Sequence, residues 1–315
     1  IIEELVQVYY SILGGNMVKN KNAFGVMMLM LAAIIWGSAF SAQSIGARYV
    51  NAYTFLAIRS WISFIAMIPV VCFFKKKKSG GEKTKDKSYK KTLFIASLCS
   101  GFFLFFASAM QQIGIKESNA SKAGFITALY LILVPIISII FFKAKEGIKL
   151  WISVVLSIIG MFLLCIHGGI SLQYGDAILL FCALLFALQI ITVGHFVKKV
   201  DVLDLSIFQF FVVACFSSVV MIVVEKPPVD MIMKAMPALL YVGVLSGACG
   251  YTLQNVGQLY VRPSIASLLM SLESVFSAIF AWIILGEVLG GRELIGAIMM
   301  FVAIIVAQLP AKGDE

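Results

Sequence analysis

The same pattern of apolar stretches and landmark residues occurs twice along this chain of 315 residues. Trp36 and Arg59 are 23 residues apart in the first half, and Phe186 and Gln209 have the same spacing in the second half. A further set repeats with an offset of 146, in which Ser100, Gly101 and Ala120 correspond to Ser246, Gly247 and Ala266. If each half crosses a membrane an odd number of times, the second half is inserted upside down relative to the first, as in many secondary transporters.

The composition independently indicates an integral membrane protein. Hydrophobic residues make up 61% of the chain and charged residues 13%, whereas about 25% of the residues in an ordinary soluble domain are charged. Because a spanning helix needs roughly 20 mostly apolar residues, we predict an all-α integral membrane protein with ten transmembrane helices. Their predicted ranges are 24–44, 52–74, 92–113, 118–142, 148–168, 175–196, 204–224, 235–259, 263–285 and 292–310.

These spans divide the chain into two five-helix repeats. The first repeat covers residues 24–168, and the second, inverted repeat covers residues 175–310. Residues 1–23 are expected to form a cytoplasmic N-terminal segment, within which we interpret Met17 as the natural start, and residues 311–315 a cytoplasmic tail. The longest connection, residues 75–91, is a lysine-rich loop, so we expect no soluble domain.

The loops carry a strong bias of positive charge, which predicts the orientation because cytoplasmic segments retain Lys and Arg. If the first span begins inside, 18 of the 25 Lys and Arg lie on the inner side, six lie on the outer side, and Arg59 lies within a span. We therefore predict a multi-pass protein of the plasma membrane with both termini in the cytoplasm. The same bias accounts for the net charge of +9 beside the lipid bilayer, without a nucleic-acid partner.

The residues that carry most metal, redox and catalytic chemistry are sparse. The chain has two histidines, and its six cysteines lie in apolar stretches without a CxxC or Cys/His cluster, so we expect no disulfide, no metal site and no cofactor. Neither HExxH nor GxSxG occurs, which leaves an intramembrane enzyme as a remote alternative. No GxxxxGK[ST] loop occurs, so a solute or ion gradient is the expected energy source.

Two ionisable residues are predicted to lie deep in the membrane, where charge is costly and usually functional. Glu273 lies about ten residues into the ninth span, near the midplane, and Arg59 lies about eight residues from the outer end of the second span. We expect each to be the partner of the other, either in a solute site or in a structural ion pair. Glu273 is also a candidate for binding a cationic group or a coupling proton.

Helical periodicity predicts a polar face on the third and eighth spans. In the eighth span, the residues that recur every three or four positions are Gly243, Gly247, Tyr251, Gln254 and Gln258, with Asn255 adjacent. The corresponding residues of the third span are Ser97, Gly101, Ser108 and Gln112. Two such faces predict a shared cavity, and the alternative is close helix packing with amide hydrogen bonds.

A midplane cavity of this kind would be lined by the first, third, fourth, sixth, eighth and ninth spans. The residues predicted to bind the solute are Trp36, Arg59, Gln112, Tyr130, Gln254, Asn255, Gln258 and Glu273. For Trp36, aromatic packing within the helix bundle is the alternative role. The scarcity of deep charge favours neutral, zwitterionic or weakly cationic solutes over polyanions.

Three motifs resemble those of the EamA family of the drug/metabolite transporter superfamily. They are Trp36-Gly37-Ser38-Ala39-Phe40, Lys122-Ala123-Gly124-Phe125-Ile126-Thr127 leading to Val134-Pro135, and Leu272-Glu273-Ser274-Val275-Phe276 through Leu285-Gly286-Glu287. The resemblance covers about residues 24–310 and implies two inverted five-helix repeats, a central cavity and transport of small metabolites, often outward. Family members commonly have proline after the glutamate of the ninth span. Ser274 takes its place here, so a kink beside Glu273 would lack its usual cause.

Together these features predict a secondary transporter that exports small metabolites, such as amino acids or neutral or cationic amphiphiles, by alternating access. Its expected partners are a small-molecule solute and the lipid bilayer, and it is expected to be a monomer or a homodimer. A flippase for a lipid-linked substrate, or a channel, on the same scaffold is the alternative. A flippase should have a lateral apolar opening with basic contacts, whereas a carrier should have an enclosed polar pocket.

Overall fold

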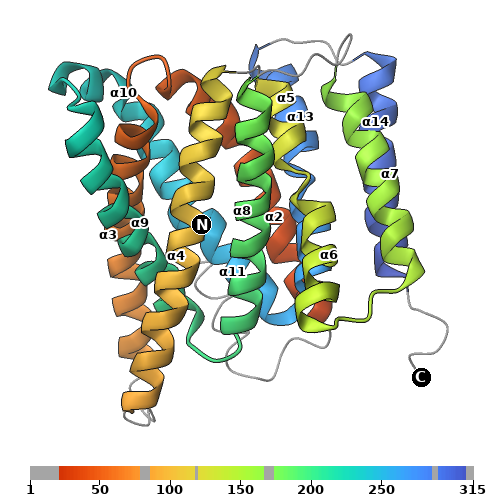
Figure 1. The fold of residues 1–315 in the computed structure, drawn as a ribbon, viewed down its shortest axis with the longest axis horizontal. Helices are drawn as coiled ribbons and strands as arrows, with labels where there is room; N and C mark the ends of the chain where they lie inside the picture. The colour runs from red at the N-terminus through yellow and green to blue at the C-terminus, as the bar shows by residue number, and fades with distance from the viewer. Residues whose placement is uncertain (1–20, 79–85, 118–119, 167–173, 286–289, 310–315) are drawn as a thin grey trace.

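The structure of the protein, a computed structural model, describes residues 21–78, 86–117, 120–166, 174–285 and 290–309 (Figure 1). Met17 and the rest of residues 1–20, the middle of the lysine-rich loop, Glu287 of the third motif and the predicted tail lie outside the described residues. Within the described ranges the chain forms helices and no strands.

Ten helices or groups of consecutive helices are long and apolar enough to cross a membrane. In chain order they are α2 (Lys21–Gly46), α3 (Ala52–Lys78), α4 (Lys87–Glu117), α5 and α6 (Ala120–Thr127 and Tyr130–Phe142), α7 (Ile148–Cys165), α8 (Tyr174–Phe196), α9 and the π-helical η1 (Val202–Val220 and Met221–Glu225), α10, the π-helical η2 and α11 (Val229–Tyr241, Val242–Gly250 and Tyr251–Tyr260), α12 and α13 (Pro263–Met270 and Glu273–Leu285), and α14 (Gly291–Gln308). Each overlaps one predicted span, so the all-α fold class with ten spans is confirmed.

The helices pack in pairs that relate the two halves of the chain (Figure 1). The second span packs on the seventh (α3 on α9), and the fifth span packs on the tenth (α7 on α14). The third span packs on the sixth (α4 on α8), and correspondingly the first span packs on the eighth (α2 on α11). This pairing is the one expected if a two-fold axis relates the halves, while the inversion of the second half stays a prediction.

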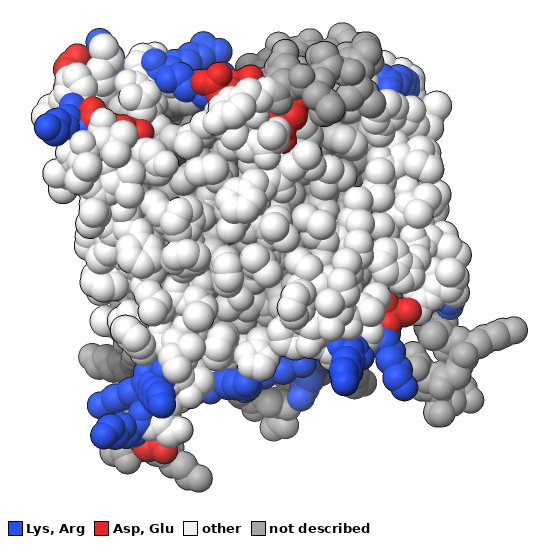
Figure 2. Space-filling model, viewed as in Figure 1, with Lys and Arg blue, Asp and Glu red and all other residues white. Residues whose placement is uncertain are grey.

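The charged residues on the surface shown in Figure 2 lie at the two ends of the bundle. On the face seen in Figure 2, a wide belt without Lys, Arg, Asp or Glu separates the two ends. Lys and Arg dominate the lower end, where Figure 1 places the connection between α6 and α7 and the C-terminal end of α14, whereas the upper end carries both signs of charge. This arrangement is that of a multi-pass membrane protein, because charge is excluded from the hydrocarbon layer.

Two of the spans are interrupted near the middle of the bundle. The fourth span breaks at residues 128–129 between α5 and α6, and the ninth breaks at residues 271–272 between α12 and α13. The absence of the usual proline after Glu273 left a kink there without its usual cause, yet the ninth span is interrupted directly before Glu273. In the break the hydroxyl of Ser271 donates to the carbonyl of Leu268 at 2.8 Å, a side-chain hydrogen bond to the backbone of the kind that competes with regular helix geometry.

The N-terminus of α3 is capped by a residue from the other half of the chain. The carboxylate of Glu225, at the end of η1, accepts hydrogen bonds from the backbone N–H groups of Tyr53 and Thr54 at 2.9 and 2.7 Å, and from the Thr54 hydroxyl at 2.6 Å. A carboxylate at this position also interacts favourably with the positive end of the helix. Glu225 therefore joins the second and seventh spans at one end of the bundle.

We expect Glu225→Ala to lower the free energy of unfolding by about 1–2 kcal/mol, because it leaves backbone donors of α3 without a partner. The thermal unfolding midpoint in detergent measures this effect. Asp230→Asn is the matched control, since Asp230 makes only an exposed ion pair of 4.0 Å with Lys234, a contact of little energetic value. Equal midpoints for the two variants would contradict the proposed cap.

Candidate functional site: a central polar cavity

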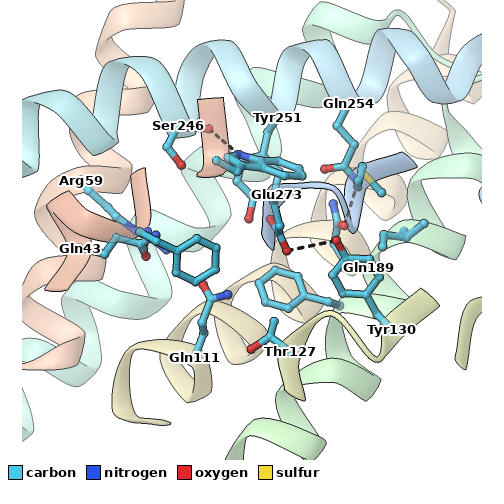
Figure 3. Close-up of a pocket in the computed structure, with 15 residues that line it drawn as sticks. Gln43, Arg59, Gln111, Thr127, Tyr130, Gln189, Ser246, Tyr251, Gln254 and Glu273 are labelled. Atoms are coloured by element: carbon cyan, nitrogen blue, oxygen red, sulfur yellow. Dashed lines mark hydrogen bonds between the residues drawn. The ribbon is translucent and has the colours of Figure 1, made fainter. Parts of the chain in front are cut away.

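A cavity lies between the two halves of the bundle, at the level of the helix interruptions (Figure 3). The empty space among its side chains is about 510 Å³, including space open to solvent. The six spans expected to line it all contribute, and the second span contributes through Arg59. The lining residues are Trp36, Phe40, Gln43, Arg59, Gln111, Thr127, Tyr130, Phe186, Gln189, Ile190, Ser246, Tyr251, Gln254, Met270 and Glu273.

The two interrupted helices place an acid and a phenol together in this cavity. Glu273 is the first residue of α13, and Tyr130 is the first residue of α6. The Tyr130 hydroxyl donates to the Glu273 carboxylate at 3.1 Å, and both side chains are buried. A carboxylate in the first turn of a helix is stabilised by the helix dipole. The interruptions therefore let an acid lie in the interior of the bundle next to a free helix end.

Arg59 does not pair with Glu273, contrary to our expectation. In the part of the chain that the structure describes, no ion pair joins them; the Arg59 guanidinium instead donates to the side-chain oxygen of Gln43 at 3.0 Å and lies 5.8 Å from the centre of the Phe55 ring. Figure 3 shows Arg59 and Gln43 on one side of the cavity and Tyr130 on the other. Each of the two charged groups therefore has a neutral hydrogen-bond partner.

An aromatic wall lies beside the two charged groups. The Trp36 indole N–H donates to the carbonyl of Ser246 at 3.1 Å, which fixes the ring. The centres of the Trp36 and Tyr251 rings are 4.8 Å apart, and Phe210 contacts Tyr251 from the other side at 5.4 Å. Phe186 also lines the cavity and contacts the Tyr130 ring at 6.4 Å. The cavity thus combines an apolar surface with separate positive and negative groups.

Three predicted solute-binding residues do not line the cavity. Gln112 points between helices, where its amide donates to the backbone carbonyl of Gln43 at 3.4 Å, and the preceding residue, Gln111, lines the cavity instead. Asn255 donates to the Ser206 hydroxyl at 2.8 Å, and Gln258 lies behind the wall and donates to the carbonyl of Ile190 at 2.9 Å. Each of these three amides makes a buried hydrogen bond to another helix, as in the packing alternative, while the side-chain oxygens of Gln112 and Asn255 have no hydrogen-bond partner among the described residues.

Five of the eight predicted residues do lie on the wall of the cavity, and solute binding by them stays a prediction. They are Trp36, Arg59, Tyr130, Gln254 and Glu273. The sequence also contains a signal for Gln43, Thr127 and Gln189, because polar residues inside an apolar span mark a pathway. Phe186 corresponds to Trp36 in the repeat and Phe40 belongs to the motif of the first span, whereas no signal distinguished Met270 from the many apolar residues of its span.

Comparison with known proteins gives two separate family matches along this chain. The sequence model of the EamA-like transporter family matches residues 23–166 and again residues 173–308. The chain belongs to the EamA-like transporter family. The three motifs around Trp36, Gly124 and Glu273 thus identified the family correctly. Each match contains five of the ten candidate membrane spans, so the EamA unit occurs twice.

Individual relatives agree with this assignment. The chain is 28% identical over 289 residues to an uncharacterized transporter of Archaeoglobus fulgidus, with 92% of this chain and 87% of the relative covered. It is 21% identical to an uncharacterized transporter of Methanothermobacter thermautotrophicus, with 93% and 88% covered. A solved crystal structure at 15% identity superimposes with a TM-score of 0.74 over 90% of this chain and 96% of that one. The family match and the two named relatives indicate a membrane transporter, and the superposition supports the fold.

Proposed function

We propose that this EamA protein is a secondary transporter that exports small zwitterionic metabolites, such as amino acids, by alternating access around the central cavity. Arg59 would bind the carboxylate of the solute, and Glu273 with Tyr130 would bind its ammonium group. Trp36, Tyr251 and Phe186 would contact its apolar part. The protein would act without a cofactor and without catalysis, in the plasma membrane.

The observation that carries this proposal is that the two deep charges face one cavity without pairing with each other. Arg59 is bonded to Gln43, and Glu273 is bonded to Tyr130. A buried charge without an opposite charge is costly, so a solute that supplies both missing charges gains more there than in water. A zwitterion supplies one of each. A polyanion would meet the carboxylate of Glu273 and a single guanidinium, which disfavours its binding.

The proposed orientation rests on the charge bias, and export is part of the proposal itself. The end of the bundle at which Lys and Arg predominate in Figure 2 would face the cytoplasm. Both termini would also be cytoplasmic. Export requires that the solute enter from this end and leave at the other. The packing of the two halves in corresponding pairs supports rocking of one half against the other as the means of alternating access.

Solute exchange in proteoliposomes, with a radiolabelled neutral amino acid such as leucine, tests this function. Unlabelled competitors should include the free amino acid, its N-acetyl derivative, which has lost the positive charge, and its methyl ester, which has lost the negative charge. We expect each modified competitor to be at least about tenfold weaker, because each leaves one buried charge without a partner. Equal competition by all three would contradict recognition of a zwitterion, and export of lipid-linked compounds alone would favour a flippase.

A further inference from the structure

Three glutamines at one wall of the cavity form a hydrogen-bonded chain whose direction is fixed. The Gln258 amide nitrogen donates to the backbone carbonyl of Ile190 at 2.9 Å. The Gln254 amide nitrogen donates to the side-chain oxygens of Gln258 and Gln189, both at 3.1 Å. Because a carbonyl only accepts, Ile190 determines which end of the Gln258 amide is nitrogen, and this in turn orients the other two amides.

In this orientation of the three amides, one amide donor and one amide acceptor are not used by the hydrogen-bonded chain. Within the described part of the chain, the Gln189 amide nitrogen and the Gln254 amide oxygen are buried without a hydrogen-bond partner. Both side chains are 1% exposed and both line the cavity. Figure 3 shows them side by side next to Tyr130 and on the side away from Arg59. Leaving such groups unpaired in a buried position is unfavourable, so the pair favours a solute that satisfies both.

We infer that Gln189 and Gln254 form a subsite for a neutral group that carries a hydrogen-bond acceptor beside an N–H donor, such as a carboxamide or a ureido group. This inference rests on the proposed function: the charged groups of a zwitterion bind Arg59 and Glu273, and its side chain reaches the two amides. Gln258 does not touch the cavity. It is a positioning residue, since it keeps the oxygen of Gln254 free toward the solute.

Three amino acids of similar size test the subsite by competition for exchange in proteoliposomes. L-Glutamine offers an acceptor and a donor, L-methionine sulfoxide an acceptor alone, and L-norleucine neither. We expect L-glutamine to compete about tenfold better than L-norleucine, with L-methionine sulfoxide between them, because a site built for hydrogen bonds rejects a ligand that leaves it unpaired. Glutamine should also raise the unfolding temperature of the purified protein more than norleucine does.

Amino-acid substitutions test which residues of the chain cause the preference for glutamine over norleucine. Gln189→Met and Gln254→Met should each reduce the ratio between glutamine and norleucine at least fivefold, with norleucine competition retained. Gln258→Met should lower the ratio although it touches no solute, because Gln254 can then rotate its amide. The matched control is Gln209→Met, since the Gln209 amide is also buried without a partner in the described chain but lies outside the cavity. It should keep the wild-type ratio.

The possible results distinguish failure of the proposed subsite from failure of the proposed function. Wild-type protein that exchanges zwitterions but prefers none of the three side chains overturns the subsite and leaves the proposed function intact. A glutamine preference that survives in both Gln189→Met and Gln254→Met also overturns the subsite. Failure to exchange any zwitterion overturns the proposed function itself. Since every ratio is measured within one variant, a lower amount of folded protein does not affect the result.

Discussion

Replacing Glu273 with glutamine should remove the ability of the protein to distinguish a free amino acid from its N-acetyl derivative. Glu273 is the one acid among the described residues that line the cavity, so of these residues it alone can supply the charge that an ammonium group needs. Glutamine keeps the size of the side chain and can still accept the hydrogen bond from Tyr130. We expect competition by the free amino acid to weaken about 30-fold, or ~2 kcal/mol, and competition by the N-acetyl form to change little.

Removing the positive charge of Arg59 should have the converse effect on the competition. Arg59→Gln should remove the difference between the free amino acid and its methyl ester, while the N-acetyl form remains discriminated against through Glu273. A control for loss of a buried carboxylate as such is Glu146→Gln. Glu146 lies outside the cavity, where it accepts a hydrogen bond from Ser264 at 2.5 Å. If Glu146→Gln and Glu273→Gln alter the competition ratios equally, the ratios report a general disturbance of the bundle and not recognition of charge.

The same glutamate variant tests proton coupling. If Glu273 carries the coupling proton, Glu273→Gln should abolish transport driven by a pH gradient and leave exchange of the N-acetyl competitor measurable. Unchanged pH-driven flux in this variant would contradict the coupling role. Because exchange and gradient-driven flux are measured in the same proteoliposomes, recognition of the solute and coupling to protons are separated.

The number and placement of the spans could be predicted because length and hydropathy determine what crosses a bilayer. A segment such as residues 202–225 is too apolar and too long to be anything else in this chain. The cost of burying polar groups likewise pointed to the region of the site: Trp36, Arg59, Tyr130, Gln254 and Glu273 all line the cavity. Membrane burial thus makes the few polar residues of each span informative.

The predictions that were wrong concern which side chains face the cavity and which residues pair with each other. These features depend on the rotation of each helix about its axis and on the neighbouring helices. A helix turns about 100° per residue. Predicting Gln112 in place of its neighbour Gln111 therefore selects a side chain on a different face of the helix. The interruptions at residues 128–129 and 271–272 have no proline or glycine pair to reveal them. The choice of Gln43 as the partner of Arg59 depends on how α2 and α3 are placed relative to each other in the bundle, which no local pattern encodes. Periodicity therefore predicted where the site lies but not which residues form hydrogen bonds with its side chains.

Adding one methyl group at Gly37 should disturb both the fold and the site. A Cβ at this position of α2 would lie 2.6 Å from the Cβ of Phe276, 2.8 Å from the carbonyl oxygen of Glu273 and 2.8 Å from the backbone nitrogen of Ser277. Two of these three atoms belong to the backbone, so no side-chain rotation relieves the contact. Gly37→Ala must push α2 away from α13 at the interruption that holds Glu273. We expect a loss of stability of about 1–3 kcal/mol.

Gly124→Ala is the matched control, because Gly124 is also inside a helix, in the motif of the fourth span, but a Cβ there would meet no atom within 4 Å. Both substitutions gain the same helix propensity, about 1 kcal/mol, so the difference between them isolates the contact between α2 and α13. Thermal unfolding in detergent should place Gly37→Ala below Gly124→Ala, and amino-acid exchange should fall only in Gly37→Ala, since displacement of α2 moves Trp36 away from Tyr251. A Gly37→Ala protein as stable and as active as Gly124→Ala would mean that the first span does not hold the helix end of Glu273 in place.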